Sequence, residues 1–285
     1  MLLGAYYEAV TYFLHQENIP FELGERSETP FPIIYIREQN LCIHLISIAQ
    51  FQTVQLPKLF FQQLSEDFSV HQSRLIHLWE DVWCAKTEVV KSRLLALLGR
   101  STRIHARLCQ VQRIDKSTVD KFLTSNHLQV ITNAKFKYGI FINPSYFTRY
   151  QQVLAPYSSL VAAATFSAAR TVHREGQPYR SVELIRFANL RGCTVVGGLD
   201  KLIKAFINEH HPDDIMTYAD RDWSNGRGYE KVGFQRIEVT PPQTFLLDIQ
   251  NQIRHYPKRL HDIPSDWISI ENAGNLKYLL DLRKK

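Results

Sequence analysis

A carboxylate ends an apolar run at residues 215–219, which has the pattern of a buried strand and turns polar at Asp220. Ligands of open α/β sheets bind beyond the carboxyl ends of the strands, so Asp220 is a candidate for binding or proton transfer. Arg186 stands inside another apolar run, residues 182–188, where a guanidinium needs a partner. Glu183 lies at an odd separation from Arg186, which places the two on opposite faces of a regular strand. Asp220 is therefore the expected partner of Arg186, either in catalysis or in a buried ion pair that braces the sheet.

A basic, glycine-containing loop follows the second of these runs and precedes a helix predicted at residues 199–208. The loop residues that could contact a ligand are Arg191, Gly192, Val196, Gly197 and Gly198. Backbone N–H groups in such a loop can approach a phosphate closely, and the helix dipole favours the anion. The loop is a candidate pyrophosphate site, although paired glycines before a helix are also ordinary punctuation between a strand and a helix.

The hydrophobic periodicity predicts an α/β chain with two main parts. In the first hundred residues we expect helices at 5–16 and 79–98 and strands at 31–36, 41–48 and 75–78. Beyond them we expect strands at 104–111, 136–142, 160–166 and 182–188, and helices at 115–123 and 199–208. The predicted domains are residues 1–100, residues 101–248 and a C-terminal extension, residues 249–285, that packs on the second domain.

Charge is distributed unevenly along the chain. Residues 1–100 carry a net charge of −3, whereas residues 101–285 carry +9. A surplus of this size permits attraction to an anion, such as a nucleic acid or a phosphorylated cofactor, and is equally compatible with a solvated surface.

Other features of the composition exclude several classes of protein. The four cysteines form no Cys-x-x-Cys pair, which predicts neither a zinc site nor a disulfide framework. The sequence has no apolar run long enough to span a bilayer and no secretory signal, so no membrane association and a cytoplasmic location are expected.

The second part of the chain has a recognisable order of elements: a strand, a glycine loop, a helix, a strand ending in Tyr-Ala-Asp, and a run from Asn225 to Phe234 that contains Tyr-Glu-Lys-Val-Gly-Phe. With these features residues 104–248 resemble the GNAT family of N-acetyltransferases. The resemblance implies a mixed sheet flanked by helices and acetyl-CoA or another acyl-CoA as cofactor, with its pyrophosphate in the glycine loop. It also implies that Tyr229 protonates the departing thiolate. The family's loop pattern of Gln or Arg, two residues, Gly, one residue, and Gly or Ala is met here only if residues are shifted.

A narrower resemblance is to Mom-like DNA-modification proteins and to phage proteins related to homing endonucleases. The matching stretches are Asn126-His127, residues 183–187, Tyr218-Ala219-Asp220 and the run up to Tyr229. The resemblance implies group transfer to an amine of a DNA base and assigns catalytic roles to His127, Arg186, Asp220 and Tyr229. Histidine and a perturbed carboxylate can each accept an amine proton near neutral pH. The Asn-His pair is equally typical of a helix end.

Three residues near the same strand end could bind a nucleic acid: Arg221, Trp223 and Arg227. An aromatic ring beside guanidinium groups can stack an unpaired base and hold its phosphates. We therefore expect a nucleic acid, above all DNA, as partner, whereas the oligomeric state is not predicted. The alternative is that the tryptophan is simply packed beside a turn.

The stretches at residues 77–83 and 88–94 resemble a restriction-endonuclease-like domain. In that family two carboxylates on adjacent strands bind the metal, but Ile33 and His44 stand at those positions here. Isoleucine cannot coordinate a hard cation, and one histidine does not replace two carboxylates. We expect no metal site and interpret this region as a degenerate nuclease domain that recognises or positions a partner.

The sequence thus predicts an α/β chain in which a GNAT-like domain follows a small restriction-endonuclease-like domain. The expected function is transfer of an acyl-type group to an amine, with a nucleic-acid base as the acceptor. The alternative is a non-catalytic DNA-binding accessory protein of a phage or mobile element.

Overall fold

The computed structural model describes residues 4–154, 158–174, 176–257 and 263–283. The chain divides into two compact units, each assembled from separate stretches of sequence. Unit 1 comprises residues 1–87, 219–227 and 238–276, and unit 2 comprises residues 88–218, 228–237 and 277–285. These boundaries differ from the linear domains predicted at residues 100 and 248, because the chain leaves unit 2 after Tyr218 and returns to it at Gly228.

The segment predicted to pack on the second domain belongs mostly to unit 1. Leu247, Ile270 and Ala273 share one buried apolar cluster with Phe31 and Trp79, and all of these residues lie in unit 1. Burial of these side chains holds the C-terminal segment in that core, and only its last residues, 277–285, belong to unit 2.

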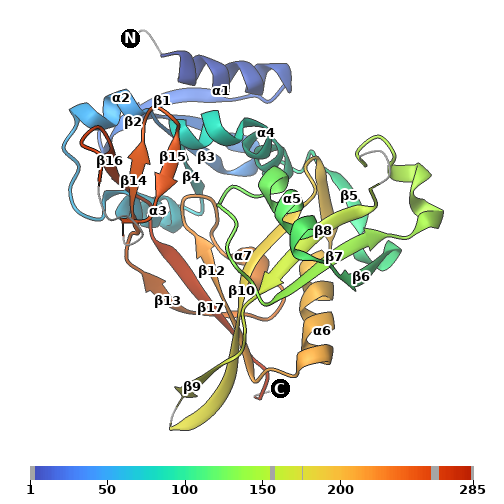
Figure 1. Ribbon diagram of the computed structural model, residues 1–285. Coiled ribbons are helices and arrows are strands. Elements are labelled where there is room, and N and C mark those ends of the chain that lie inside the picture. Colours follow the sequence, from blue (N-terminus) through green and yellow to red (C-terminus); the bar gives the residue numbers. More distant parts are fainter. Residues whose placement is uncertain (1–3, 155–157, 175, 258–262, 284–285) are drawn as a thin grey trace. The chain divides into compact units, whose positions relative to one another are not determined.

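Unit 2 contains a mixed sheet with a helix on each face (Figure 1). Its strands are β5 (Thr102–His105), β6 (Cys109–Arg113), β7 (Phe136–Ile142), β8 (Leu160–Phe166), β9 (Arg170–Arg174), β10 (Gln177–Asn189) and β11 (Cys193–Val196), and its helices are α5 (Lys116–Asn126), α6 (Gly198–His210) and α7 (Arg227–Glu230), the last of which begins at the unit boundary. Strands β12 (Asp214–Asp220), β13 (Gln235–Thr240) and β17 (Asn275–Asp281) have residues in both units.

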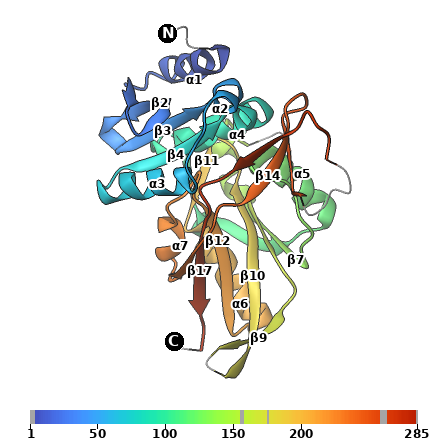
Figure 2. The ribbon, with the colours of Figure 1, turned by 90° about the vertical axis from the view of Figure 1, so that its left-hand side faces the viewer.

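The strand order of this sheet is β13-β17-β12-β10-β8-β7-β6, with β9 paired to β10. The pairs β6·β7, β7·β8 and β8·β10 are antiparallel, whereas β10 and β12 are parallel. Figure 2 shows β10, β12 and β17 side by side, and both views show the β9–β10 hairpin projecting from the end of the sheet. The predicted fold class, a mixed α/β chain with a mixed sheet flanked by helices, is confirmed.

Alternation of side chains assigns the two helices to opposite faces of the sheet. Phe206 of α6 stacks on Phe166 at a centroid distance of 4.0 Å. On the other face, Phe122 of α5 shares an apolar cluster with Ala163 and Ala188. Because residues at odd separations on a strand point to opposite faces, Phe166 and Ala163 identify an α6 face and an α5 face.

The predicted strand at residues 104–111 is two strands in the structure. A turn of 3₁₀ helix, Ala106–Leu108, separates β5 from β6. β5 pairs in parallel with β11, whereas β6 pairs with β7 in the main sheet. The turn redirects the chain from one sheet to the other.

None of the described helices combines the length and apolar composition that crossing a lipid bilayer requires.

Unit 1 contains a four-stranded sheet and a small three-stranded sheet. Its elements are α1 (Ala5–Gln16), β1 (Glu22–Arg26), β2 (Thr29–Ile36), β3 (Leu41–Ile46), α2 (Ile48–Thr53), α3 (Phe60–Val70), β4 (Arg74–Trp79), the first part of α4 (Glu80–Leu97), β14 (Thr244–Asp248), β15 (Ile253–His255) and β16 (Ile268–Glu271). The predicted hairpin is present as β2 and β3, and its register places Ile33 opposite His44. Helix α4 is interrupted at Lys86, next to the boundary between the units.

His44 belongs to a buried chain of hydrogen bonds in this sheet. His77 Nε2 lies 3.1 Å from the carbonyl oxygen of Phe61, which can only accept, so this nitrogen carries the hydrogen and shares it with Ser65 Oγ at 2.8 Å. His77 Nδ1 must then accept from His44 Nδ1 at 2.9 Å, and His44 Nε2 accepts from the hydroxyl of Thr29 at 2.7 Å. Each ring nitrogen has a defined role only while both imidazoles are neutral.

Burial lowers the pKa of both histidines. For His77, burial and the charge of Arg221 outweigh the hydrogen bond to Phe61 and lower the pKa to about 3. An additional proton on either ring would also place two N–H groups opposite each other between the Nδ1 atoms. The neutral pair therefore stabilises the fold above the ordinary histidine pKa of 6.5, and this stability is lost as the pH falls below it.

We predict that the free energy of unfolding decreases by about 2 kcal/mol between pH 7 and pH 5 through His77 alone, because the unfolded state gains a proton that the folded state excludes. Urea unfolding of the wild-type chain and of His77→Asn at both pH values measures this difference. The variant cannot titrate at this position, so its pH dependence should be shallower. Parallel pH dependences for the two proteins would contradict the proposed neutral pair.

Candidate functional site

The central feature of unit 2 is a β-bulge in β10. Leu184 pairs with Phe166 of β8, and Arg186 pairs with Thr165, so Ile185 is an extra residue on β10. A bulge shifts the alternation of side chains by one position. Leu184 shares the α6 face with Phe166, whereas Arg186 shares the α5 face with Thr165.

The bulge brings Glu183 and Arg186 onto the same face. Glu183 precedes Leu184 and therefore points to the α5 face, as Arg186 does. Burial raises the pKa of the Glu183 carboxyl, and the positive charges of Arg186 and Arg170 oppose that shift. The expectation that Glu183 and Arg186 lie on opposite faces was wrong, because it assumed a regular strand.

Arg186 also anchors the segment that follows α5. Its Nη2 donates to the carbonyl oxygen of Val130 at 3.2 Å, and its Nη1 donates to the carbonyl oxygen of Ile185 at 2.9 Å. The pair that was predicted between Arg186 and Asp220 stays a prediction, since the two residues belong to different units.

Tyr229 lies near Arg186 within unit 2. Burial raises the pKa of its phenol, while a hydrogen bond with Thr217 and the positive charges of Arg93 and Arg186 lower it. The net shift is upward, so Tyr229 stays protonated at neutral pH and can act as a proton donor. Thr217 Oγ1 in turn donates to the carbonyl oxygen of Leu184 at 2.9 Å, next to the bulge.

His127 is the C-cap of α5, three residues before Val130. Its Nδ1 accepts from the backbone N–H of Gln129 at 3.0 Å. This contact fits the helix-end interpretation of the Asn-His pair. Asn126 is buried and accepts from the backbone N–H of Arg191, so it connects α5 to the loop after β10.

Parallel pairing between β10 and β12 covers only part of either strand. In the described register it runs from Ser181 opposite Asp214 to Glu183 opposite Met216. Both strands then continue, β10 to Asn189 and β12 to Asp220. The described ladder thus ends at Glu183, two residues before the bulge at Ile185.

A pocket of about 430 Å³ lies at the amino end of α6. It is lined by His105, Ala106, Arg107, Val196, Gly197, Asp200, Lys201 and Lys204. Arg107 and Lys204 are exposed, whereas Lys201 donates to the carbonyl oxygens of Ala106 and Cys109. Lys204 pairs with Asp200 at 2.7 Å. Because the lining has more basic than acidic residues, it keeps a positive surplus beside the positive end of the helix dipole.

The structure divides the predicted phosphate-binding loop. Val196 and Gly197 line the pocket, and Gly197 has a φ of 76°, which favours glycine. Arg191 and Gly192 lie in the turn before β11, at the opposite end of that strand. These two residues do not line the pocket, and their predicted role in cofactor binding stays a prediction.

Gly198 has a packing role. A Cβ atom there would lie 2.9 Å from Val195 Cγ1 and 3.3 Å from Ile140 Cδ1. The glycine permits close packing of α6 on the sheet, and its predicted contact with a cofactor stays a prediction.

Asp220 organises a turn in unit 1. Its Oδ1 accepts from the backbone N–H of Asp222 at 3.1 Å, and its carbonyl oxygen accepts from the backbone N–H groups of Trp223 and Ser224. Burial and the nearby charge of Asp220 raise the pKa of Asp222, whose Oδ1 accepts from the backbone N–H of Ala273. The described contacts of Asp220 support a structural role.

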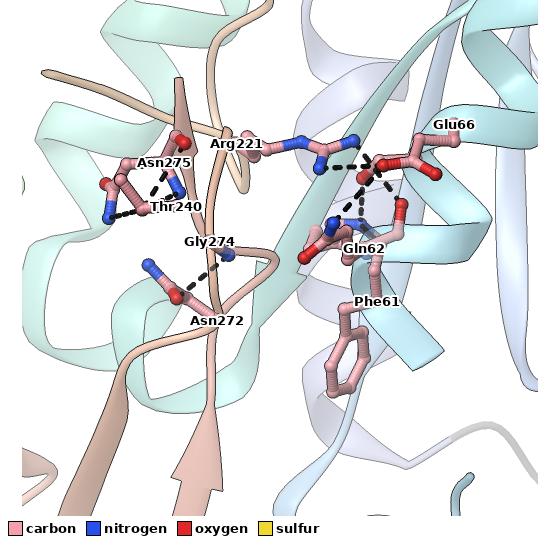
Figure 3. Close-up of polar contacts among 10 residues, drawn as sticks. Phe61, Gln62, Glu66, Arg221, Thr240, Asn272, Gly274 and Asn275 are labelled. Atoms are coloured by element: carbon pink, nitrogen blue, oxygen red, sulfur yellow. Dashed lines mark hydrogen bonds and ion pairs between the residues drawn. The ribbon is translucent and has the colours of Figure 1, made fainter. Parts of the chain in front are cut away.

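Two of the three predicted nucleic-acid contacts are buried. Figure 3 shows that the Arg221 guanidinium lies against α3, where it pairs with Glu66 at 3.2 Å and donates to the carbonyl oxygen of Gln62. Trp223 is only 5% exposed. Its ring has no exposed face on which a base could stack, so the prediction for these two residues was wrong, whereas Arg227 is exposed.

Sequence reasoning missed five residues around the two sites: Glu183 as a titratable group of the centre, Thr217, Arg93, Arg107 and Lys204. A bulge cannot be recognised from the sequence of an apolar run, so Glu183 was predicted to point to the wrong face of the sheet. The basic run at residues 100–107 was a visible signal for Arg107, but its connection to the start of α6 depends on the pairing of β5 with β11.

Comparisons with known proteins gave similarity of structure only. No protein-family model and no curated protein matches the sequence. Solved structures that resemble the chain include the NatC complex bound to Gag peptide and CoA, with 12% identity, a TM-score of 0.35, and coverage of 61% of this chain and 98% of that chain.

Two further similar structures are bacterial acetyltransferases. One is the ribosomal-protein-S18-alanine N-acetyltransferase from Escherichia coli, with 9% identity, a TM-score of 0.35, and coverage of 61% of this chain and 94% of that chain. The other is an acetyltransferase of Bacillus subtilis in complex with CoA, with 15% identity, a TM-score of 0.33, and coverage of 61% and 99%. Likeness at this level carries no information about substrate or activity.

We predict that replacing Arg186 with methionine raises the pKa of Glu183 further above 4.5, because the nearest positive charge is removed while the side-chain length is kept. An NMR titration of the ¹³C-labelled Glu183 carboxyl measures the shift. The matched control is Arg191→Met, which removes an exposed arginine of the same unit and should leave the pKa unchanged. A pKa that stays the same or falls in the Arg186 variant would place the two side chains on opposite faces.

Proposed function

We propose that unit 2 transfers an acyl group from an acyl-CoA, such as acetyl-CoA, to an amine. The observation that carries this proposal is the bulge in β10, which puts a carboxyl of raised pKa beside Arg186, and the charge of Arg186 also acts on the protonated phenol of Tyr229. Amine acylation needs one group that takes a proton and another that gives one, and this pair supplies both. The GNAT resemblance of the sequence supports the same reaction.

The donor fits the pocket at the amino end of α6. Its volume is in the range of small-molecule sites, and Arg107 and Lys204 complement the negative charge of a pyrophosphate beside the helix dipole. In the described register the backbone ladder between β10 and β12 ends at Glu183, and the backbone of β10 beyond Leu184 could pair with an extended donor arm. When bound, an acyl-CoA supplies an activated thioester.

The residues of the chain would act on protons. The Glu183 carboxylate accepts a proton from the amine as the amine nitrogen bonds to the acyl carbon and the carbon–sulfur bond breaks. A raised pKa brings the carboxyl closer to neutral pH, where a general base is most effective. The Tyr229 hydroxyl gives its proton to the departing sulfur. The positive charge of Arg186 favours the ionised form of the Glu183 carboxyl, which is the form that accepts a proton.

As acceptor we propose a nucleic-acid base, as the narrower resemblance of the sequence implies. The net charge of +9 in residues 101–285 supports attraction to a nucleic acid. Arg221 and Trp223 give it no support, so binding would use exposed basic residues such as Arg103 and Arg107.

The alternative function is a non-catalytic DNA-binding accessory protein. It requires DNA affinity that falls steeply with salt and that does not depend on Glu183 or Tyr229, because released counterions would supply most of the binding free energy. The residues around the bulge favour an enzyme, since a non-catalytic DNA-binding protein has no need of a partly buried carboxyl with a raised pKa.

We predict that acetyl-CoA binds the chain saturably and that Arg107→Glu/Lys204→Glu weakens this binding at least tenfold, because two cations of the pocket become anions. Calorimetric titration measures both affinities. Lys121→Glu is the matched control, since it reverses an exposed charge on α5, which does not line the pocket. Equal affinities in the double variant and the wild type would place the donor elsewhere, and an absence of binding would remove the proposal.

We predict further that Tyr229→Phe and Glu183→Gln keep acetyl-CoA affinity but slow thiol release by about 100-fold or more, as expected for lost proton transfer. The assay follows free thiol from acetyl-CoA with a single-stranded, adenine-containing oligodeoxynucleotide as the amine. An oligonucleotide of thymine alone is the control substrate. Equal thiol release with both oligonucleotides would contradict the base as acceptor.

A further inference from the structure

Three side chains on the α5 face occupy consecutive positions across three strands. Lys137 of β7 pairs with Thr165 of β8, and Thr165 pairs with Arg186 of β10. Paired residues on neighbouring strands point to the same face and lie about 5 Å apart. A lysine and an arginine therefore occupy the positions on either side of Thr165.

The hydroxyl of Thr165 is buried without a hydrogen-bond partner. The residue is 2% exposed, and its Oγ1 contacts no donor or acceptor of the described residues. Buried hydroxyls in native proteins are nearly always hydrogen-bonded, so an orphan of this kind indicates a missing partner.

A second orphan hydroxyl lies in the segment attached to the same cations. Arg186 donates to the carbonyl oxygen of Val130, and Lys137 Nζ donates to that of Ala134 at 2.8 Å. Between these two anchors lies Thr132, whose Oγ1 is also buried without a described partner. Both unsatisfied hydroxyls thus belong to one region bounded by Lys137 and Arg186.

We propose that Lys137, Thr132, Thr165 and Arg186 bind an oxyanion, a carboxylate or phosphate group of the acceptor molecule. Hydroxyls can donate to an oxyanion, and the flanking cations offset its charge. The inference rests on the proposed function in one respect, since it assigns this group to the molecule whose amine is acylated.

The position of Glu183 agrees with such an acceptor. The carbonyl oxygen of Glu183 accepts from the backbone N–H of Ser167, and the backbone N–H of Glu183 donates to Ser167 Oγ at 3.0 Å. Ser167 directly follows β8 and is two residues from Thr165 along the chain. This separation is about 7 Å along the strand. A compact molecule can therefore place its anionic group at Thr165 and its amine at Glu183, the acidic residue of β10. The acceptor class is an amine that carries an acidic group, either an amino acid or a nucleotide.

The test follows the threonine methyl groups of the full chain by NMR during addition of sodium phosphate or sodium acetate, with sodium chloride at matched ionic strength as reference. We expect saturable shifts of the Thr132 and Thr165 methyl signals with phosphate, acetate or both, and none with chloride. Tighter phosphate binding identifies a nucleotide-like acceptor, and tighter acetate binding identifies an amino-acid-like one.

Thr165→Val removes the hydroxyl and keeps the shape of the side chain. It should weaken oxyanion binding at least fivefold, read from the Thr132 signal, without lowering the melting temperature, because the hydroxyl has no partner to lose. Thr171→Val, at an exposed position of β9, is the matched control and should bind as the wild type does. Absence of saturable shifts at these threonines, or unchanged affinity in Thr165→Val, would overturn the inference.

No acyl donor is present in these titrations, so their outcome is independent of acyl-CoA binding. Oxyanion binding without acetyl-CoA binding would contradict the proposed acyltransferase function and support the proposed anion site. The reverse result would keep the donor site and remove this acceptor class.

Discussion

One extra residue in β10 determines the chemistry of unit 2. Without the bulge at Ile185, the three-residue separation on a regular strand would point the carboxyl of Glu183 and the guanidinium of Arg186 to opposite faces of the sheet. With it, a partly buried carboxyl, two guanidinium groups and a phenol share one region. β-Bulges are found near active sites because they re-aim a side chain in this way.

The rest of the unit keeps this strand in place. Helices α5 and α6 bury opposite faces of the sheet, the first through Phe122 and the second through Phe206. Beyond the carboxyl end of α5 the face becomes polar, and Arg186 and Lys137 fasten the next segment through its carbonyl oxygens. The apolar half of the face thus provides rigidity, and the polar half provides the groups that can contact a substrate.

Much of the fold could be predicted from the sequence, because long apolar runs define buried strands. Residues 136–142 and 160–166 are strands with the predicted bounds. The division of the chain into units could not be predicted, since it depends on which core receives Leu247 and Ile270. The 3₁₀ turn at 106–108 was equally hidden inside a continuous β-like pattern.

The candidate site was predictable only in part, for physical reasons. Arg186 and Tyr229 were found because an arginine in an apolar strand and a family-like tyrosine are visible in the sequence. Trp223 and Arg221 were assigned to a nucleic-acid-binding surface because an aromatic ring beside guanidinium groups can stack a base, whereas both side chains are buried in unit 1. A strand between Gly192 and Gly197 separated two parts of a loop that sequence treats as continuous.

The claim on which this account depends is that Glu183 and Arg186 interact across the bulge. A double-mutant cycle of Glu183→Gln and Arg186→Met, followed by the free energy of unfolding in urea at pH 7, measures that interaction most directly. The account predicts a favourable coupling of about 0.5 kcal/mol or more between the two side chains, as found for residues in contact. Additive effects of the two substitutions would contradict it, and would return Glu183 to the opposite face of the sheet.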